Sequence, residues 1–394
     1  MACPENILKE YESKYAKNPI KFVQQRWDYS IAEGFYEKLK EDCTFFSFPP
    51  ITTFPVGKCI FHKNRKVKSD EGIEFNILPA INVPILKQFF YIVTLAFKLC
   101  NWGFRNRKHK QTILTHCIYP QSAIPAFIAR FLTGCKVFSV VPDLPEHSVP
   151  YMYKKHPIME ALYKLFVGLS TSLKHMFDGY ICVSKYQMDY IKSNSPYMIM
   201  EGTLNFDLFD SLKPTALKTQ DKIIIYAGGI LEKYGAKLLI DGFVKASIPN
   251  TQLWFFGYGD CEEYILQNEC NNVKYNGNIS RKELIGIEKS AFLLVNPRPT
   301  HEEYSKCSFP SKLMDYMATG TPVLTSKLLC IGEEYDDLML YFNEITADGI
   351  SEGLINAINN PKLKEIGIRA EQHMRNKKNS LYQATRVINF IENN

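Results

Sequence analysis

Residues 296–325 contain the pattern with the clearest chemistry, NPRPTHEEYSKCSFPSKLMDYMATGTPVLT. It predicts a strand end, a charged loop, a short amphipathic helix and a new strand. Arg298 in the loop and Lys312 at the helix start would face one point, together with the free N–H groups of the helix N-terminus. These N–H groups carry roughly half a positive charge, while arginine offers a planar fork and lysine a compact cation. The pattern therefore predicts a binding site for a diphosphate.

The elements that must hold this site alternate regularly in the second half of the chain. Apolar, β-branched runs predict strands at 223–227, 252–256, 273–275, 292–295, 322–325 and 339–342. Amphipathic segments predict helices at 236–246, 281–289, 312–319 and 350–359. Such alternation indicates a parallel sheet with helices on both faces.

Ligands bind at the carboxyl ends of the strands in sheets of this kind. The first two predicted strands end there in glycine-bearing turns, at Gly228, Gly229, Gly257, Tyr258 and Gly259. Either turn alone is equally well explained as a plain tight turn. Two of them in consecutive strand-to-helix connections favour a ligand site.

The first half repeats the pattern less cleanly. It predicts strands at 113–116, 136–141 and 179–183, and helices at 22–40, 86–102, 123–132 and 159–176. A chain of 394 residues exceeds the roughly 250–300 residues of one core. We therefore expect two doubly wound α/β domains, 1–205 and 206–394, with a last helix at about 375–394 that packs back on the first domain.

The N-terminus does not open on a strand. Residues before Phe22 are polar and charged, whereas a doubly wound domain normally begins with a buried strand. We expect either that the first strand is missing from the sequence as given or that the fold dispenses with it.

Charge, cysteine spacing and missing motifs narrow the possible ligands and the cellular compartment. A net charge of +6 suits anionic substrates or an anionic membrane surface, and no nucleic-acid-binding motif is present. The 11 cysteines have irregular spacing without a C-x-x-C pair, which is typical of reduced thiols in a cytoplasmic protein. No D-x-D loop stands out, so we expect no metal.

Several of these stretches resemble the family 4 retaining glycosyltransferases, in the version found in bacterial polysaccharide and cell-wall biosynthesis. The donor-domain matches are YAGGILEKYGAKLLI at 226–240, FFGYGD at 255–260, and NPRP followed by FPSKLMDYMATGTPVL at 296–324. Weaker matches in the first half are VVPDLPEH at 140–147 and ICVSKYQM at 181–188. The resemblance implies a GT-B fold, in which two Rossmann-like domains face a cleft. It also implies transfer of a sugar, with retention and without a cofactor, from a UDP- or GDP-linked donor to a glycan or lipid-linked acceptor.

The resemblance also implies roles for individual residues. Arg298 and Lys312 would neutralise the leaving diphosphate, and Asp315 would accept hydrogen bonds from the ribose hydroxyls. The helix start that presents N–H groups would be Ser308, Phe309, Pro310 and Ser311.

Two positions depart from the family pattern. Cys307 stands where the first Glu of the E-x(7)-E motif is expected, so Glu302 or Glu303 would have to reach the sugar. Gly229 stands where an arginine is frequent, which leaves the diphosphate to Arg298 and Lys312, with Lys233 as a further candidate.

Most candidates have a structural alternative. Lys312 could instead pair with Asp315 at i,i+3, and Arg298 could be a solvated charge at a strand end. Asp143 is a candidate to orient the acceptor, or else a turn or helix-cap residue. Tyr258 could stack on the base or be a plain turn aromatic, and Glu146 and His147 are weaker acceptor-side candidates.

Residues 85–104 are strongly apolar and are followed at once by RNRKHK at 105–110. This order predicts peripheral membrane contact through 85–110, at the inner face of the plasma membrane. A core helix followed by a solvated loop is the alternative.

Two other functions stay open. A non-catalytic paralogue could bind a nucleotide-sugar or a partner subunit, and Gly229 and Cys307 give that interpretation its weight. A GT-B sugar-nucleotide epimerase would be expected to carry more carboxylates and histidines at the cleft.

Overall fold

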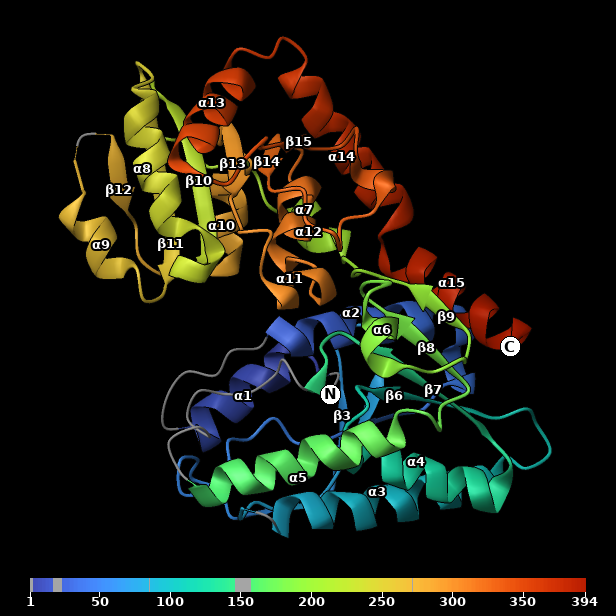
Figure 1. Cartoon of the computed structure of the whole chain (residues 1–394). Coiled ribbons are helices and arrows are strands. Elements are labelled where there is room, and N and C mark those ends of the chain that lie inside the picture. The colour runs from blue at the N-terminus through green and yellow to red at the C-terminus, as the bar shows by residue number, and fades with distance from the viewer. Residues whose placement is uncertain (1–2, 17–22, 85, 146–156, 271) are drawn as a thin grey trace. The chain divides into compact units, whose positions relative to one another are not determined.

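The computed structural model describes residues 3–16, 23–84, 86–145, 157–270 and 272–394. The chain divides into two compact units (Figure 1): unit 1 comprises Met1–Thr203 and Ser380–Asn394, and unit 2 comprises Leu204–Asn379. The chain thus passes between the units twice. Leu204 and Asn379 are the first and last residues of unit 2, and they form an isolated β-bridge. Leu204 also donates its N–H to the carbonyl of Lys378 at 2.9 Å.

Unit 2 is built on a parallel sheet of six strands, in the order β12-β11-β10-β13-β14-β15. The strands are β10 (Lys222–Gly229), β11 (Thr251–Tyr258), β12 (Val273–Tyr275), β13 (Leu293–Asn296), β14 (Val323–Thr325) and β15 (Leu340–Tyr341). All six strand predictions for this half are confirmed, with small differences at the ends. The continuous apolar runs of β10 and β13 fit strands that are covered on both faces.

The strand order reverses between β10 and β13. From β10 the chain adds β11 and β12 on one side, then returns to add β13, β14 and β15 on the other. The connections that leave the carboxyl ends of β10 and β13 therefore diverge. In doubly wound sheets the crevice at this switch point is where ligands bind.

Helical segments precede, connect and follow these strands. They are α7 (Phe206–Ser211), η4 (Glu232–Tyr234), α8 (Ala236–Ala246), α9 (Glu262–Gln267), α10 (Arg281–Glu288), α11 (Glu303–Cys307), α12 (Ser311–Ala318), η5 (Glu333–Tyr335), α13 (Ala347–Ile358) and α14 (Leu363–Lys377). The four helix predictions for this half match α8, α10, α12 and α13. Helices α8 and α13 lie side by side (Figure 1), and Phe243 and Leu354 join residues of β10 and β11 in one apolar core.

Unit 1 holds three smaller sheets among its described residues. The parallel sheet has the order β6-β7-β8-β9 and consists of β6 (Thr112–His116), β7 (Lys136–Val141), β8 (Gly179–Cys182) and β9 (Tyr197–Ile199). The other two, β1-β4-β3 and β2-β5, consist of β1 (Phe45–Ser47), β2 (Phe61–His62), β3 (Arg65–Lys68), β4 (Glu74–Ile77) and β5 (Ala80–Ile81). The three predicted strands are β6, β7 and β8. The unpredicted strands have only two to four residues, too few to show an alternating pattern.

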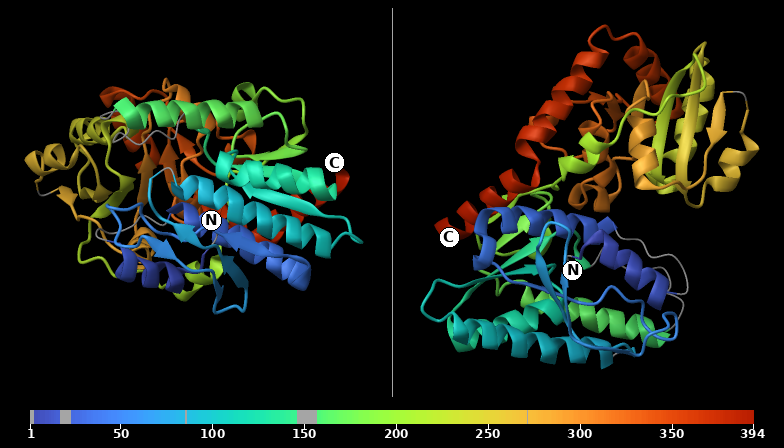
Figure 2. Two further views of the ribbon diagram at one scale, coloured as in Figure 1. Left: turned by 90° about the horizontal axis from the view of Figure 1, so that it is seen from below. Right: turned by 180° about the vertical axis from the view of Figure 1, so that it is seen from behind.

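The helices of unit 1 are α1 (Glu5–Tyr15), α2 (Val23–Leu39), η1 (Lys40–Asp42), α3 (Leu86–Arg105), α4 (Pro120–Thr133), α5 (Pro157–Leu173), α6 (Gln187–Ile191) and α15 (Ser380–Asn393). Helix α3 packs against α4, and α4 against α5 (Figure 2). Helix α15 packs against α2, and its Val387 joins Phe35 and Phe138 in an apolar core. In the described chain before β1 the elements are helical, and no described helix is long and apolar enough to cross a bilayer.

Candidate functional site

The carboxyl edge of the unit 2 sheet brings the glycine turns next to the loop after β13. Gly228 and Gly229 end β10, and they lie in register with Gly257 and Tyr258 of β11. On the other side, β13 ends at Asn296, whose side-chain amide donates to Thr325 Oγ1 of β14 at 2.9 Å. This edge is therefore fixed on both sides of the switch point.

Lys312 lies directly beneath the β10 turn. A Cβ added at Gly228 would stand 3.2 Å from Lys312 Cε, and Lys312 Nζ lies 3.8 Å from the ring centre of Tyr226. The Nζ atom is buried and has no hydrogen-bond partner among the residues that the structure describes. Burial and the charge of Arg298 lower the pKa of Lys312 to about 7, against the opposing influence of Glu288.

Arg298 follows β13 by two residues and lies next to two tyrosine rings. Its guanidinium carbon is 4.5 Å from the ring centre of Tyr304 and 5.1 Å from that of Tyr234. One Nη donates to the carbonyl of Ser308 at 3.4 Å, whereas the buried Nε has no partner in the described chain. With only 5% of its surface exposed, Arg298 is not the solvated strand-end charge of the alternative interpretation.

Two tyrosine hydroxyls hold the β10 turn in place. Tyr226 donates to the carbonyl of Gly229 at 2.7 Å, and Tyr316 of α12 accepts from the N–H of Ala227 at 2.7 Å. The second bond ties the helix that carries Lys312 to the strand that carries Gly228. The turn and the cation beneath it are thus fixed together.

Asp315 forms a bidentate ion pair with Arg281 of α10. The Nη2–Oδ1 distance is 2.7 Å and the Nε–Oδ2 distance is 3.2 Å. The i,i+3 pair with Lys312 is therefore not formed, and that alternative is wrong. The Asp315 side chain keeps 31% of its surface exposed, and each oxygen retains a lone pair for a further donor.

Glu288 of α10 is a buried carboxyl that the sequence interpretation missed. Its pKa is raised well above the ordinary range by burial and by the charge of Asp315, although Arg281 and Lys312 oppose this. The sequence does carry a signal for this position. Glu288 and Arg281 are seven residues apart and share a helix face with buried Ile285, which places both side chains on the inner face of α10. Arg281, Tyr234 and Tyr304 were also missed, and their roles depend on contacts between elements.

The remaining glycines of the predicted site serve strand packing. Gly257 has φ +125, and a Cβ there would stand 1.9 Å from the carbonyl oxygen of Gly228. A Cβ at Gly259 would stand 1.9 Å from the carbonyl oxygen of Ile230. Tyr258 between them is 41% exposed. Close approach of the neighbouring backbone thus gives a structural reason for glycine at both positions.

The segment before α12 is anchored by its aromatic residue. Pro310 is the N-cap of α12, which begins at Ser311. It offers no side-chain cap, but its carbonyl accepts from the N–H of Leu313 at 2.9 Å. The ring of Phe309 lies 5.6 Å from that of Tyr335, and Ser308 receives the bond from Arg298 described above. Lys312 is the second residue of α12, so its side chain belongs to the first turn of this helix.

The candidates for the sugar side are less well supported. Glu303 is paired with Lys306 at 2.6 Å, its side chain is 64% exposed, and it begins α11. Glu302 lies 3.5 Å from His301. Cys307 is 3% exposed, so a buried thiol occupies the position where a carboxylate was expected.

The acceptor-side candidates belong to unit 1. Asp143 is exposed and follows the carboxyl end of β7. Glu146 and His147 lie outside the described residues.

Lys233, the further candidate for the diphosphate, lies in η4 of unit 2. Its Nζ is 5.3 Å from the ring centre of Tyr234 and 5.5 Å from that of Tyr304, the two rings next to Arg298.

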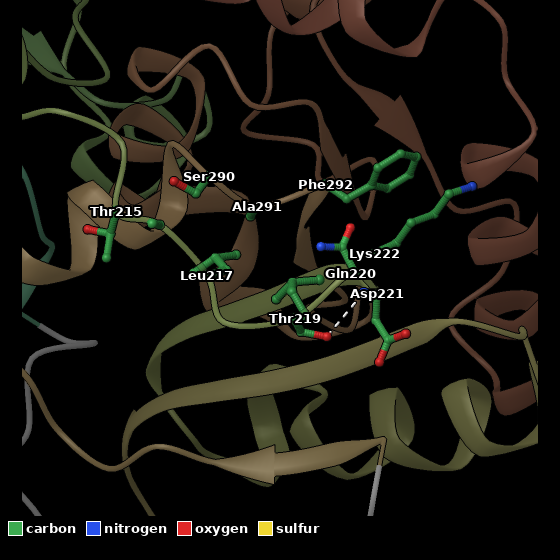
Figure 3. Close-up of a pocket in the computed structure, with 11 residues that line it drawn as sticks. Thr215, Leu217, Thr219, Gln220, Asp221, Lys222, Ser290, Ala291 and Phe292 are labelled. Atoms are coloured by element: carbon green, nitrogen blue, oxygen red, sulfur yellow. Dashed lines mark hydrogen bonds between the residues drawn. The ribbon is translucent and has the colours of Figure 1, made fainter.

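A separate hollow of about 460 Å³ lies at the other edge of the unit 2 sheet (Figure 3). It is lined by Asp221 and Lys222 where β10 begins and by Phe292 just before β13. Lys222 Nζ lies 4.7 Å from the Phe292 ring centre. Because the strands are parallel, this hollow lies at the amino ends and is no part of the site around Lys312. The described residues contain no group of acidic, His or Cys side chains that could hold a metal.

The site can therefore bind a compact anion with more than one charge. Two neighbouring cations, Lys312 and Arg298, both have a buried nitrogen without a partner in the described chain, and Lys312 belongs to the first turn of a helix.

Comparison with known proteins agrees with this chemistry. Residues 209–374 match the family model described as glycosyl transferases group 1, whereas a search of curated proteins gave no match. Among solved structures, a sucrose-phosphate synthase from Thermosynechococcus elongatus is 16% identical, with a TM-score of 0.63, over 94% of this chain and 93% of that one. A glycosyltransferase from Rickettsia africae is 14% identical, with a TM-score of 0.63, over 95% and 96%. A UDP-forming α,α-trehalose-phosphate synthase from Burkholderia xenovorans is 10% identical, with a TM-score of 0.60, over 92% and 96%. The chain thus has the predicted α/β fold of GT-B type, and its second unit matches the glycosyl transferases group 1.

Proposed function

We propose that this protein is a retaining glycosyltransferase. It moves a sugar from a UDP- or GDP-linked donor to a glycan or lipid-linked acceptor, in polysaccharide or cell-surface glycan biosynthesis. The proposal places it in the cytoplasm.

One observation carries the proposal. Lys312 Nζ and Arg298 Nε are buried at the switch point of a doubly wound sheet, and neither has a hydrogen-bond partner among the described residues. A buried cation without a counter-charge is costly. Such an arrangement is expected where a ligand supplies the missing anion, and a nucleoside diphosphate has the required charge and size.

The same groups account for the reaction. The bond between the anomeric carbon and the diphosphate oxygen breaks, and negative charge develops on the leaving diphosphate. Lys312, Arg298 and the first turn of α12 stabilise that charge with groups that are already in place. The acceptor hydroxyl attacks from the same face and gives its proton to the departing phosphate oxygen, so the anomeric configuration is retained.

Other predicted residues take supporting roles. Asp315, held in place by Arg281, accepts from the ribose hydroxyls with its remaining lone pairs. Gly228 and Gly229 let the β10 turn approach the diphosphate. Glu303 is the candidate to contact the donor sugar, and Asp143 in unit 1 is the candidate to orient the acceptor.

Support for UDP comes from a protein with a similar fold. The Burkholderia trehalose-phosphate synthase is described as UDP-forming. At 10% identity this guides the order of a donor screen and leaves GDP-linked sugars as the second class to try.

The proposal is tested by nucleotide-sugar binding and turnover. Calorimetry with UDP-, GDP- and ADP-sugars on the full chain should show one nucleotide class that binds. Lys312→Ala or Arg298→Ala should weaken that binding about tenfold to hundredfold, the effect of losing a charged hydrogen bond. Lys282→Ala, on the exposed face of α10, is the matched control and should bind normally. If no nucleotide-sugar binds the folded protein, the proposal is wrong.

A non-catalytic paralogue remains the second candidate, because a buried Cys307 occupies the expected carboxylate position. Slow hydrolysis of the bound donor or its transfer to any acceptor, followed by NMR of the anomeric proton, decides between the two. Tight donor binding with no turnover would favour the paralogue.

A further inference from the structure

Helix α3 is apolar on two opposite faces. One face is buried in unit 1 through Tyr91, Leu95 and Leu99. The opposite face exposes a stripe with helical spacing, made of Leu86, Phe89, Val93, Phe97 and Phe104. A surface helix normally places polar residues on the face that points to solvent. Packing within unit 1 therefore does not explain why this stripe is apolar.

The two neighbouring helices also expose large apolar side chains. Phe131 of α4 is 89% exposed, and Leu165 of α5 is 60% exposed. Because α3 packs against α4 and α4 against α5, the exposed apolar side chains belong to one layer of helices (Figure 2). Apolar surface repeated over neighbouring elements marks an interaction site more strongly than single exposed residues do.

The distribution of charged residues around α3 indicates which class of partner fits this apolar surface. Residues 75–142 contain eight Lys or Arg and not one Asp or Glu. Four of the eight, Arg105, Arg107, Lys108 and Lys110, follow directly on the apolar stripe of α3 and are exposed. A second copy of this surface would bring like charges together, which disfavours self-association. An anionic lipid surface satisfies both the apolar and the basic part.

We propose that unit 1 docks on an anionic phospholipid bilayer through the layer α3–α4–α5. Helix α3 lies in the plane of the interface with its exposed stripe at the boundary between headgroups and acyl chains. The basic segment 105–110 contacts the headgroup phosphates. The inference does not depend on the donor site; only its consequence, access to a lipid-linked acceptor, rests on the proposed function.

The test is flotation of the full chain with vesicles of phosphatidylcholine, with and without phosphatidylglycerol. We expect binding only when phosphatidylglycerol is present, and weaker binding at high salt. Phe97→Ser with Phe131→Ser, and separately Arg107→Glu with Lys108→Glu, should each weaken binding by at least about tenfold. Val244→Ser with Leu266→Ser removes apolar side chains of unit 2 that are 55% and 53% exposed, and should leave binding unchanged.

Three outcomes would overturn the inference: no binding to anionic vesicles, an equal loss in the unit 2 control, or face variants that change only the oligomeric state. The last outcome would show that a second copy covers the layer. Nucleotide-sugar calorimetry on the same samples keeps the two proposals apart. Failure to float leaves donor binding intact, whereas failure to bind any donor leaves flotation intact.

Discussion

At the scale of the residue, Lys312 combines a cost to stability with a use in binding. Its ammonium is buried against the Tyr226 ring and has no hydrogen-bond partner in the described chain. A side chain selected for stability alone would be apolar at this position. Functional sites are where such conflicts between local preference and fold are expected.

Lys312→Met should therefore stabilise the free protein while abolishing its response to nucleotide-sugars. The apolar side chain fills the same space without a buried charge, and we expect the free energy of unfolding at neutral pH to rise by about 1 kcal/mol or more. Urea unfolding with and without the donor measures both effects. Lys282→Met, at an exposed position, should change neither, and a destabilised Lys312→Met would contradict the argument.

Donor affinity should also depend on pH through Lys312. Its pKa is lowered to about 7 in the free protein, and a bound diphosphate favours the protonated form. Binding should therefore take up a proton, and affinity should fall as the pH rises through about 7, by up to about tenfold per pH unit.

A UDP-sugar suits this measurement, because its diphosphate is a diester that does not titrate near neutrality. Calorimetry in buffers of different ionisation enthalpy reports the proton uptake. Lys312→Ala should bind weakly with no such pH dependence, whereas a flat profile in the unaltered protein would count against the role of Lys312.

The two tyrosine rings beside Arg298 should hold its guanidinium in position. Tyr304→Ala removes the nearer ring and should weaken donor binding about threefold to thirtyfold, the range of a cation–π contact. Tyr304→Phe keeps the ring and removes the hydroxyl, which donates to the carbonyl of Lys233 and also hydrogen-bonds with Arg298, so it should lose less affinity than Tyr304→Ala. Equal losses in both variants would instead point to the hydroxyl.

At the scale of the element, the sequence predicts best what local pattern controls. The long apolar run of β10 and the amphipathic segment of α8 could be read directly, as could the motif that carries Arg298 and Lys312. The ion pair of Arg281 with Asp315 joins residues 34 positions apart, and nothing in either helix specifies the other. The burial of Cys307 is likewise set by tertiary packing.

A substitution at Gly257 tests how the carboxyl ends of β10 and β11 support the donor site. Gly257→Ala would force a Cβ against the Gly228 carbonyl at 1.9 Å, at a backbone φ of +125 that side chains disfavour. We expect it to destabilise the protein by about 2 kcal/mol or more and to weaken donor binding, because Gly228 must move. Gly332→Ala, where a Cβ meets nothing within 4 Å, is the matched control and should be near neutral. Thermal unfolding and calorimetry measure the two effects.

At the scale of the whole molecule, the end of the chain returns to the unit in which it began. Helix α15 belongs to unit 1 although it directly follows α14 of unit 2. Its contact with α2 joins segments more than three hundred residues apart in the chain. A local pattern can show that α15 is amphipathic but cannot specify the helix that covers it.

A substitution at Val387 measures how much the packing of α15 on unit 1 contributes to stability. It is 1% exposed and shares a core with Phe35, Phe138 and Val140, so Val387→Ala should lower the free energy of unfolding by about 1–3 kcal/mol. Leu381→Ala, at a 37% exposed position of the same helix, should change it by less than about 0.5 kcal/mol. Donor affinity of the folded protein should stay the same in both variants, because the Val387 core lies in unit 1 and the cationic site in unit 2. Urea unfolding and calorimetry measure the two quantities, and a loss of donor affinity in Val387→Ala alone would show that α15 also supports the donor site.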